Sequence, residues 1–381
     1  MKEANRDGKK QQVLVIGGGI AGAATAWALS AHGGYECTVL ERESQLAIHS
    51  TAKNASILRT FTGDWASSAL ALETAEFLAA PPAGFAPHKL LDPVGLILIT
   101  TAAHGQTYER WAARKAPNAL LRLSPAELSE RYPHWNGHAQ DALLVRDEGR
   151  IDVSGLLDAL VRDAKRNGAS FVLGAQVESL LKSNGQVCGV CMTGGQTIDA
   201  DLVVIAAGGW AGKLGRAAGS ELYMEPRRRH LLVTAHDPAI DRQGPILWSE
   251  PDAFYMRPES GGWMLCACDQ DVVDPNHCAE RPEVLELIAA RTGQCLPEFA
   301  DAPVQAFWAG MRTFTKDDQF AIGFDAHVPG LFWAAGLGGH GISTSIGVGR
   351  LCANLIAGES VDNEVARAMN PARFTRVARS V

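Results

Sequence analysis

The sequence contains no long basic run, and its overall charge is negative. It has 35 Lys and Arg against 42 Asp and Glu, which gives a formal net charge of −7. The longest basic run is Arg227–Arg229. Because nucleic-acid phosphates are bound through a clustered basic footprint, we expect no nucleic-acid partner.

Cysteine is sparse, with eight residues spread over 381 positions. Disulfide frameworks are typical of short secreted domains, so this spacing does not indicate one. Cys188 and Cys191 have a Cys-x-x-Cys spacing, but they lie in a strand-like stretch where positions three apart point to opposite faces. We therefore expect no metal site.

Long apolar runs are also missing. The stretch 13–29 superficially resembles a signal peptide, but Gly17–Gly19 would interrupt its helix. No other run approaches the ~18 apolar residues of a membrane span, so we expect no transmembrane segment and a cytoplasmic location. The composition, 46% hydrophobic and 20% charged, is that of a globular protein. At about 150 residues per domain, two or three domains are expected.

A glycine motif near the amino terminus carries the first chemical signal. Residues 12–16 are a short β-branched run, and Gly17–Gly22 follows with the pattern Gly-x-Gly-x-x-Gly. Residues 23–32 favour a helix, and residues 37–40 form a second strand that ends at Glu41. This strand–turn–helix–strand order with an acidic residue about 20 positions on is the dinucleotide-binding fingerprint.

The chemistry of dinucleotide binding explains these residue types. Gly17 permits a tight turn, Gly19 lets the backbone approach a pyrophosphate, and Gly22 lets the helix pack close to the strand. The helix amino terminus offers free amides to the phosphates. Glu41 can accept hydrogen bonds from ribose hydroxyls, and its charge disfavours NADP. The motif alone does not distinguish NAD from FAD.

A second glycine cluster favours FAD over NAD. Residues 331–335 form a strand, Gly336–Gly341 follows, and a helix is expected over about 344–356. Amides at this helix start would stabilise the negative charge that a flavin gains on reduction. An NAD domain does not need a second amide cluster so far along the chain.

The remaining pattern predicts an α/β protein with a Rossmann-like, parallel-sheet FAD-binding domain and a second α+β domain on a mixed or antiparallel sheet. An amphipathic helix is expected over 152–167, a hairpin at Asn184–Gly185, and a strand over 201–205 that ends in small residues. The stretch 223–264 is more polar and broken by proline, which is typical of the second domain.

Several strings, taken in order, resemble the D-amino acid oxidase superfamily of FAD oxidoreductases, and within it the bacterial D-arginine dehydrogenases and D-amino acid dehydrogenases. The resemblance spans about residues 12–357. Besides the glycine motifs, it rests on the segments Ala31–Gly33, Leu40–Glu43, His49–Thr51, Pro81–Phe85, Ala206–Gly208, Phe254–Tyr255 and Trp308–Arg312.

The resemblance implies a discontinuous FAD-binding domain over 12–80, 145–222 and 309–362, and a substrate-binding domain over 85–144 and 223–308. Residues 1–11 are expected to be a disordered tail. The FAD is expected to be non-covalent, because the segment 312–323 has no Cys for a flavin linkage. The expected FAD contacts are Gly17, Gly19, Ile20, Ala21, Gly22, Glu41, Arg42, Ser50, Thr51, Asn54, Ala55, Ser56, Val177, Ala207, Gly208, Gly310, Gly338, Gly339, Gly341, Ile342 and Ser343.

The same resemblance implies the catalytic residues. The substrate carboxylate would be held by Arg229 and Arg312, with Tyr255 donating a hydrogen bond. Two guanidinium groups suit a carboxylate chemically. His340 is the best candidate for substrate or proton contact. The expected reaction is hydride transfer from Cα of a small amino or imino acid to flavin N5, which gives an imino acid and then a keto acid.

Departures from the D-arginine dehydrogenase pattern concern the substrate. A glutamate that holds a cationic side chain is matched here by Leu96, and two pocket residues, a His and a Tyr, are matched by Ile57 and Thr62. A glutamine beside the flavin is matched by Ser343. These differences disfavour D-arginine and favour a smaller or more apolar substrate.

Other functions remain open at this stage. The flavin could act on a 2-hydroxy acid or an N-methyl amino acid, or the chain could be the flavin subunit of a hetero-oligomeric dehydrogenase. An NAD enzyme is the third alternative. The sequence leaves open the electron acceptor (oxygen or a quinone), the chirality of the substrate and the oligomeric state.

Overall fold

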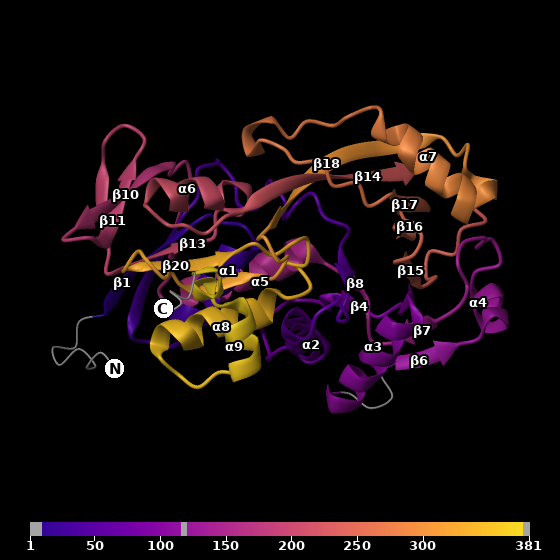
Figure 1. Ribbon diagram of the computed structural model, residues 1–381, viewed down its shortest axis with the longest axis horizontal. Helices are drawn as coiled ribbons and strands as arrows, with labels where there is room; N and C mark the ends of the chain where they lie inside the picture. Colours follow the sequence, from indigo (N-terminus) through magenta and orange to yellow (C-terminus); the bar gives the residue numbers. More distant parts are fainter. Residues whose placement is uncertain (1–9, 116–119, 376–381) are drawn as a thin grey trace, which may run out of the picture.

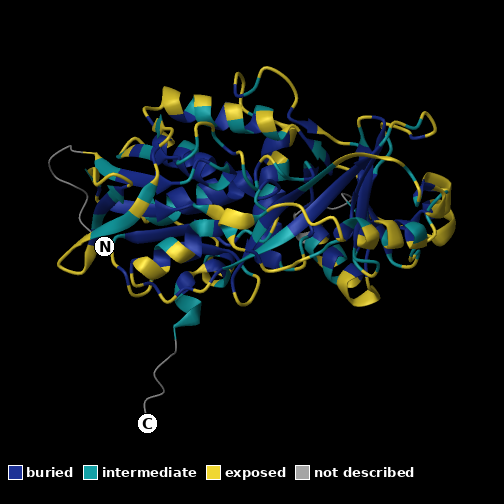
Figure 2. Cartoon of the chain, turned by 90° about the horizontal axis from the view of Figure 1, so that it is seen from above, coloured by how far each residue is buried: buried dark blue, intermediate teal, exposed yellow. Residues whose placement is uncertain are grey.

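A computed structural model describes residues 10–115 and 120–375. Figure 1 shows two large sheets at opposite ends of an elongated molecule, with two long strands running between these ends. Figure 2 shows that the strands of both sheets are buried and that exposed residues gather on loops and outer helix faces.

The six-stranded sheet is built on the amino-terminal glycine unit. All its pairings are parallel except that of β19 with β20. Its central strands are rich in Val, Ile and Leu and are buried on both faces, as parallel strands require. In spatial order the strands are β19 (Ala321–Phe324), β20 (Leu331–Ala335), β13 (Leu202–Ile205), β1 (Gln11–Ile16), β2 (Tyr35–Leu40) and β9 (Ser170–Val172).

Each face of this sheet is covered by a different layer. Alternate residues Val13 and Val15 pack toward helices, whereas Leu14 and Ile16 pack toward a small antiparallel sheet. The helical layer contains α1 (Ile20–Ala31), α2 (Trp65–Ala79), α5 (Val153–Arg166), α8 (Ser345–Ala357) and α9 (Asn363–Met369). The other layer contains β10 (Val177–Ser183), β11 (Gln186–Met192), β12 (Thr197–Asp199) and α6 (Ala211–Ala217).

The eight-stranded sheet forms the other end of the molecule. It is mixed, because β5 and β15 pair in parallel while the other pairings are antiparallel. Its spatial order is β18 (Val304–Phe314), β14 (Glu225–Thr234), β17 (Gly262–Cys266), β16 (Phe254–Glu259), β15 (Ile246–Ser249), β5 (Leu96–Ile99), β7 (Ala142–Val145) and β6 (Leu120–Leu123). Strands β14 and β18 are the long pair in Figure 1.

The two faces of this sheet have different partners. One face packs on α4 (Pro125–Arg131) and α7 (Val284–Cys295). The other face, which includes Tyr255 and Cys266, packs on Ile57 and Phe61 and on Tyr108, which belongs to α3 (Ala102–Lys115). A small sheet of β3 (Ile57–Leu58), β8 (Gly149–Ile151) and β4 (Leu91–Asp92) lies beside this second face. Short 3-10 turns complete the chain: η1 (Gly208–Trp210), η2 (Pro275–His277), η3 (Pro297–Phe299) and η4 (Pro371–Phe374).

The expected fold class, an α/β Rossmann-like unit with a second mixed sheet, is confirmed. The local expectations also hold: Asp152 caps α5, and Asn184 and Gly185 take φ values of 51° and 79° in the hairpin between β10 and β11. The expected tail 1–11 needs a correction, because Gln11 pairs with Tyr35 as the first residue of β1. Residues 1–9 lie outside the described part.

Two expected domain boundaries fall inside strands. Val145 is the last residue of β7 and Ala309 lies in the middle of β18, and both strands belong to the eight-stranded sheet. A strand is held along its whole length by one hydrogen-bonded ladder, so a boundary placed within it divides a single packed unit.

Candidate functional site

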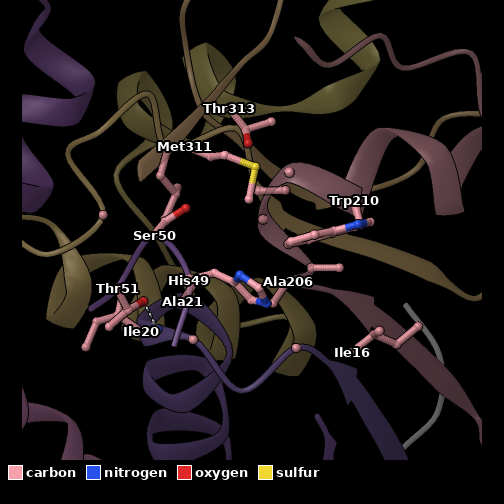
Figure 3. A pocket seen from close by; sticks show the side chains of 18 of the residues that line it. Ile16, Ile20, Ala21, His49, Ser50, Thr51, Ala206, Trp210, Met311 and Thr313 are labelled. Atoms are coloured by element: carbon pink, nitrogen blue, oxygen red, sulfur yellow. Dashed lines mark hydrogen bonds between the residues drawn. The ribbon is translucent and has the colours of Figure 1, made fainter. Parts of the chain in front are cut away.

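A cavity of about 450 Å³ runs along the carboxyl end of the parallel sheet. Its walls come from segments far apart in sequence: the first glycine motif, the loop after β2, the end of β13, the end of β18 and the second glycine cluster. Figure 3 shows Ile20 and Thr51 on one side, Met311 and Thr313 on another and Trp210 opposite Thr51, with His49 near the middle. The carboxyl end of a parallel sheet is where open α/β folds bind ligands.

The first glycine motif forms a turn that side chains would block. Gly17 has φ +108°, and a Cβ there would lie 2.6 Å from the carbonyl oxygen of Ala206. A Cβ on Gly22 would lie 2.0 Å from the carbonyl oxygen of Gly17. The turn therefore brings bare backbone to the cavity and sets α1 tightly against β1.

The start of α1 is an electropositive end that faces the cavity. Its N-cap is Gly19, which has no side-chain cap, and the first turn contains no acidic residue. The Ile20 amide donates to Thr51 Oγ1 at 3.1 Å. Ala21 lines the cavity beside it. This helix end can therefore receive an anionic diphosphate.

Glu41 lies at the end of β2 and is 8% exposed. One carboxylate oxygen accepts from the Gly18 amide at 2.7 Å and the other from the Glu43 amide at 3.0 Å. These contacts fix the carboxylate at the cavity wall. Since each oxygen can accept more than one hydrogen bond, Glu41 still has acceptor capacity for ribose hydroxyls.

The second glycine cluster closes the other end of the cavity and contacts Arg312. Gly338 and Gly339 have φ values of +52° and +92°, and a Cβ on Gly339 would lie 2.6 Å from Arg312 Nε. The Gly338 amide donates to the carbonyl of Thr313 at 3.0 Å. Arg312 can therefore lie flat against this backbone at the cavity wall.

Arg312, Arg229 and Tyr255 come together on the face of the eight-stranded sheet that includes Tyr255 and Cys266. Arg312 Nη2 donates to the Tyr255 hydroxyl at 3.5 Å. Arg229 is 5% exposed, and its Nε donates to the carbonyl of Asp269 at 2.6 Å. The Asp269 carboxylate is itself engaged by His230, at 2.7 Å from Nδ1. Within the described residues, neither Arg229 nor Arg312 is hydrogen-bonded to a carboxylate.

The neighbours of these arginines titrate abnormally. Burial raises the pKa of the Tyr255 hydroxyl well above its usual value. Burial also raises the pKa of the Cys266 thiol, but the hydrogen bond with Cys268 and the charges of Arg229 and Arg312 outweigh it and lower the pKa to about 6. The site therefore has cationic character that stabilises an anion, even a thiolate.

His340 lies in the second glycine cluster, and its amide donates to the carbonyl of Leu337 at 2.7 Å. Burial lowers the pKa of its imidazole to about 3, and the charges of Arg59, Arg312 and Arg229 act in the same direction. The ring is therefore neutral at physiological pH. It can donate or accept one hydrogen bond, but it holds no charge.

Most of the residues expected to contact FAD line one cavity. Those that do are Gly17, Gly19, Ile20, Ala21, Glu41, Arg42, Ser50, Thr51, Asn54, Val177, Ala207, Gly208, Gly338, Gly339, Gly341 and Ile342, together with Arg312. The expected residues outside its lining are Gly22, Ala55, Ser56, Gly310, Ser343, Arg229, Tyr255 and His340.

Four of the residues outside the lining have close contacts within the protein. The carbonyl of Ala55 accepts from Arg257 Nε at 2.6 Å. A Cβ on Gly310 would lie 2.7 Å from the carbonyl oxygen of Lys53. Ser343 donates to the carbonyl of Ile57 at 2.9 Å, and Gly22 packs α1 on the turn. They hold the cavity walls in place.

Sequence reasoning missed the aromatic wall of the cavity. Trp210 stands beside His49 with a ring distance of 4.8 Å, and the Arg42 guanidinium lies 3.8 Å over the indole. The one available signal was that Trp210 directly follows the small residues at the end of β13. Arg59 was also missed, because its hydrogen-bond partners Ser343 and Glu250 are 284 and 191 residues away in sequence.

Within residues 10–115 and 120–375, the cysteines are all free, and no group of three or more potential ligands could hold a metal ion. In the same residues, no helix is long and apolar enough to cross a membrane.

Comparison with known proteins identifies the class. Residues 12–355 match the family model described as DAO, FAD dependent oxidoreductase. The chain is 24% identical to FAD-dependent oxidoreductase domain-containing protein 1 of Bos taurus, over 91% of this chain and 81% of the relative. It is also 24% identical to D-amino acid dehydrogenase of Xanthobacter autotrophicus, over 96% and 100%. Among solved structures, L-proline dehydrogenase from P. horikoshii superposes with a TM-score of 0.82 at 23% identity, covering 96% of this chain and 98% of the other.

The chain therefore belongs to the DAO family of FAD-dependent oxidoreductases, and its cofactor is FAD. The cavity fits this cofactor. The start of α1, whose first turn has no acidic residue, and Glu41 suit the diphosphate and ribose of a dinucleotide, and a Cβ at Gly17 would clash with the Ala206 carbonyl and displace the turn. The second cluster of exposed backbone, at Gly338–Gly341, is where a flavin ring would find amides.

Proposed function

We propose that this protein oxidises a small amino or imino acid at Cα and passes the electrons to FAD. The observation that carries the proposal is the position of Arg312, which lines the cavity beside Gly339 and also reaches Tyr255 and the neighbourhood of Arg229. A carboxylate bound there would place the adjacent Cα against the cofactor. The family relationship supports the redox chemistry.

The residues would divide the work in a simple way. FAD supplies a hydride acceptor when bound. Arg312 and Arg229 would hold the substrate carboxylate through charge-assisted hydrogen bonds, and Tyr255 would donate a further one. Burial lowers the pKa of Arg312, as does the nearby charge of Arg229, so an incoming carboxylate relieves an unfavourable pair.

No acid or base of the chain is required for the oxidation itself. The amine would react as its neutral form, whose lone pair helps to expel the hydride, and water would then convert the imine into a keto acid with the nitrogen leaving as ammonia or, for an imino acid, as the freed amine. His340, being neutral, would contact the substrate through a hydrogen bond and not through charge. Positioning by the arginines therefore accounts for the chain's contribution.

We also propose a division of labour between the two sheets. The segments 12–80, 145–222 and 309–362 would bind FAD, without a covalent bond, and the segments 85–144 and 223–308 would bind substrate. The boundaries at 145 and 309 are moved to the ends of β7 and β18, so that both strands stay whole in the eight-stranded sheet. The expected electron acceptor is oxygen or a quinone. The division between the two sheets and the expected electron acceptor do not depend on which amino-acid enantiomer is oxidised.

An anaerobic flavin-reduction screen tests the proposed function. The purified holoenzyme is mixed with D- and L-amino acids, 2-hydroxy acids and N-methylated amino acids, and the loss of flavin absorbance is followed. We expect reduction by an amino or imino acid, with a rate that rises as the amine loses its proton. Reduction by hydroxy acids alone would contradict the proposal.

Substitution of Arg312 tests the site. Loss of a charge-assisted carboxylate contact typically costs about 1.5–3 kcal/mol, so Arg312→Ala should raise KM by about 10- to 100-fold. FAD content should stay near that of the unmodified protein, because Arg312 is one of many lining residues. Arg228→Ala, on the same strand as Arg229, is the control. Unchanged kinetics in Arg312→Ala would refute the assignment.

A further inference from the structure

A third arginine, Arg59, lies beside the proposed carboxylate site. It follows β3 directly, is 6% exposed, and its amide donates to Ser343 Oγ at 3.2 Å. The Ser343 hydroxyl in turn donates to the carbonyl of Ile57 at 2.9 Å. The backbone around Arg59 is therefore tied to the segment Gly341–Ile342 that lines the cofactor cavity.

The Arg59 side chain is connected to Arg312 by two stacked rings. Its Cζ lies 4.5 Å over the Trp248 ring, and Trp248 stacks on Tyr255 with ring centroids 4.2 Å apart and an interplanar angle of 13°. The Tyr255 hydroxyl then accepts from Arg312 at 3.5 Å. The two guanidinium groups thus lie at opposite ends of a continuous aromatic wall, formed by neighbouring strands β15 and β16.

Glu250 holds Arg59 in position. Its Oε1 accepts from Arg59 Nη2 at 2.7 Å and from the Tyr108 hydroxyl at 3.1 Å. Its Oε2 accepts from His104 Nδ1, when that nitrogen is protonated, and from Thr100. With this many donors, Glu250 is already saturated and fixes the plane of the guanidinium.

Arg59 retains hydrogen-bonding capacity. Its Nε is buried and has no partner among the described residues. Because Nε is closed off, a ligand would reach Arg59 through its terminal nitrogens, of which Nη2 alone is hydrogen-bonded to Glu250. Arg59 also acts on the same imidazole, His340, as Arg229 and Arg312 do, so its charge reaches the substrate region.

We infer that Arg59 binds a second carboxylate, so that the substrate is an aminodicarboxylic or iminodicarboxylic acid. The inference rests on the proposed function and makes it more specific. The α-carboxylate would lie on Arg312 and Arg229, the carbon chain would cross Trp248 and Tyr255, and the distal carboxylate would accept from Arg59. Since Trp248 is stacked with Arg59 and Tyr255, the methylene groups would run along the apolar edges of the two rings, and an arginine fork suits a planar carboxylate.

The inference is tested first by a matched set of substrates. Holoenzyme is assayed with aspartate and glutamate, in both enantiomers, against asparagine and glutamine, which have nearly the same shape without the charge. We expect kcat/KM for the better acid to exceed that of its amide by about 10-fold or more, the effect of one charge-assisted contact. Equal values for acid and amide would overturn the inference.

Variants then assign the effect to Arg59. Arg59→Gln should remove the preference for the acid by raising KM for the acid, while kcat/KM for the amide changes far less. Arg59→Lys should recover part of the preference, because the charge is kept. The control is Arg257→Gln, which breaks another buried arginine–glutamate pair, with Glu259, on strand β16. This control should leave the ratio of kcat/KM for the acid to kcat/KM for the amide unchanged. If Arg59→Gln lowered kcat/KM equally for the acid and the amide, Arg59 would have only a structural role.

A binding measurement separates this inference from the proposed function. Succinate and glutarate, which have no amine to oxidise, are titrated into holoenzyme and compared with butyrate, with the flavin spectrum as readout. Tighter binding of the dicarboxylates, lost in Arg59→Gln, supports the second anion site even if no amino acid reduces the flavin. Reduction by amino acids without tighter dicarboxylate binding would leave the function standing and overturn the inference.

Discussion

At the scale of single residues, burial and the arginine charges together set the charge state of this site. Burial lowers the pKa of His340 and the nearby arginine charges act in the same direction, whereas at Cys266 the Cys268 hydrogen bond and the charges of Arg229 and Arg312 outweigh burial and lower the pKa of the thiol. The difference follows from the sign of the charged form. The same field would draw a carboxylate to Arg312 and Arg229.

Glu148 is a buried carboxyl outside the proposed reaction. It is 1% exposed; its Oε1 accepts from the amide and hydroxyl of Thr60, while its Oε2 is buried without a partner. Burial raises its pKa to about 7, although the Thr60 contacts and the Arg59 charge oppose this shift. Its folded form therefore stays protonated at pH values where the unfolded chain ionises.

This shift predicts the pH dependence of stability. Between about pH 4.5 and 7 the folded state binds more protons than the unfolded state at Glu148, so its contribution to stability falls as the pH rises. Glu148→Gln removes that slope, and its stability relative to the unmodified protein should improve by up to about 3 kcal/mol from pH 4.5 to pH 8. Urea unfolding at a series of pH values measures the difference.

A second variant checks the sign. The hydrogen bonds from Arg227 and Tyr223 lower the pKa of Glu225, so Glu225→Gln should change stability in the opposite direction with pH, and only weakly because the group is partly open to solvent. Parallel stability curves for Glu148→Gln and the unmodified protein would show that Glu148 titrates normally.

At the scale of elements, the contact between β1 and α1 depends on a single missing side chain. A Cβ on Gly22 would lie 2.0 Å from the Gly17 carbonyl oxygen and 3.3 Å from Val15 Cγ1. Neither the Gly17 carbonyl nor strand β1, which carries Val15, can move far without opening the glycine turn. Gly22 thus controls the cofactor cavity without lining it.

Gly22→Ala should therefore weaken FAD binding as well as folding. Overpacking of this kind typically costs about 1–3 kcal/mol, and displacement of α1 would move its amides away from the diphosphate. Gly34→Ala is the matched control in the same unit, since a Cβ there meets nothing within 4 Å. FAD content and FAD dissociation constants measure the effect; equal affinity in both variants would contradict the argument.

The elements also show what sequence can and cannot reveal. The Gly17–Gly22 turn was predictable because its signal lies within one strand–turn–helix unit, and Arg312 because its segment resembles a family pattern. The role proposed for Arg59 was not, because Trp248 and Glu250 reach it only through long-range packing. Likewise, the hydrogen bonds of the Ser343 hydroxyl with Ile57 and Arg59 join segments 286 and 284 residues apart, which no local sequence pattern reveals.

At the scale of the whole molecule, the cavity joins parts that pack as separate cores. The six-stranded sheet buries its strands in two clusters, and the eight-stranded sheet has two others. The walls of the cavity come from both, since Gly17 and Glu41 belong to the first sheet and Met311 and Arg312 to the end of β18. A ligand that fills the cavity would link both sets of contacts.

FAD binding should accordingly stabilise both sheets together. A ligand at about 1,000 times its dissociation constant adds about 4 kcal/mol to the stability of the folded state. In hydrogen exchange, removal of FAD should increase exchange around residues 17–22, 49–54 and 338–342 alike, and lower the melting temperature. Helix α7, which packs on the opposite face of the eight-stranded sheet, serves as the internal control and should change least. Protection confined to the first glycine motif would mean that FAD does not reach the second cluster, and the assignment of the flavin end to Gly338–Gly341 would then fail.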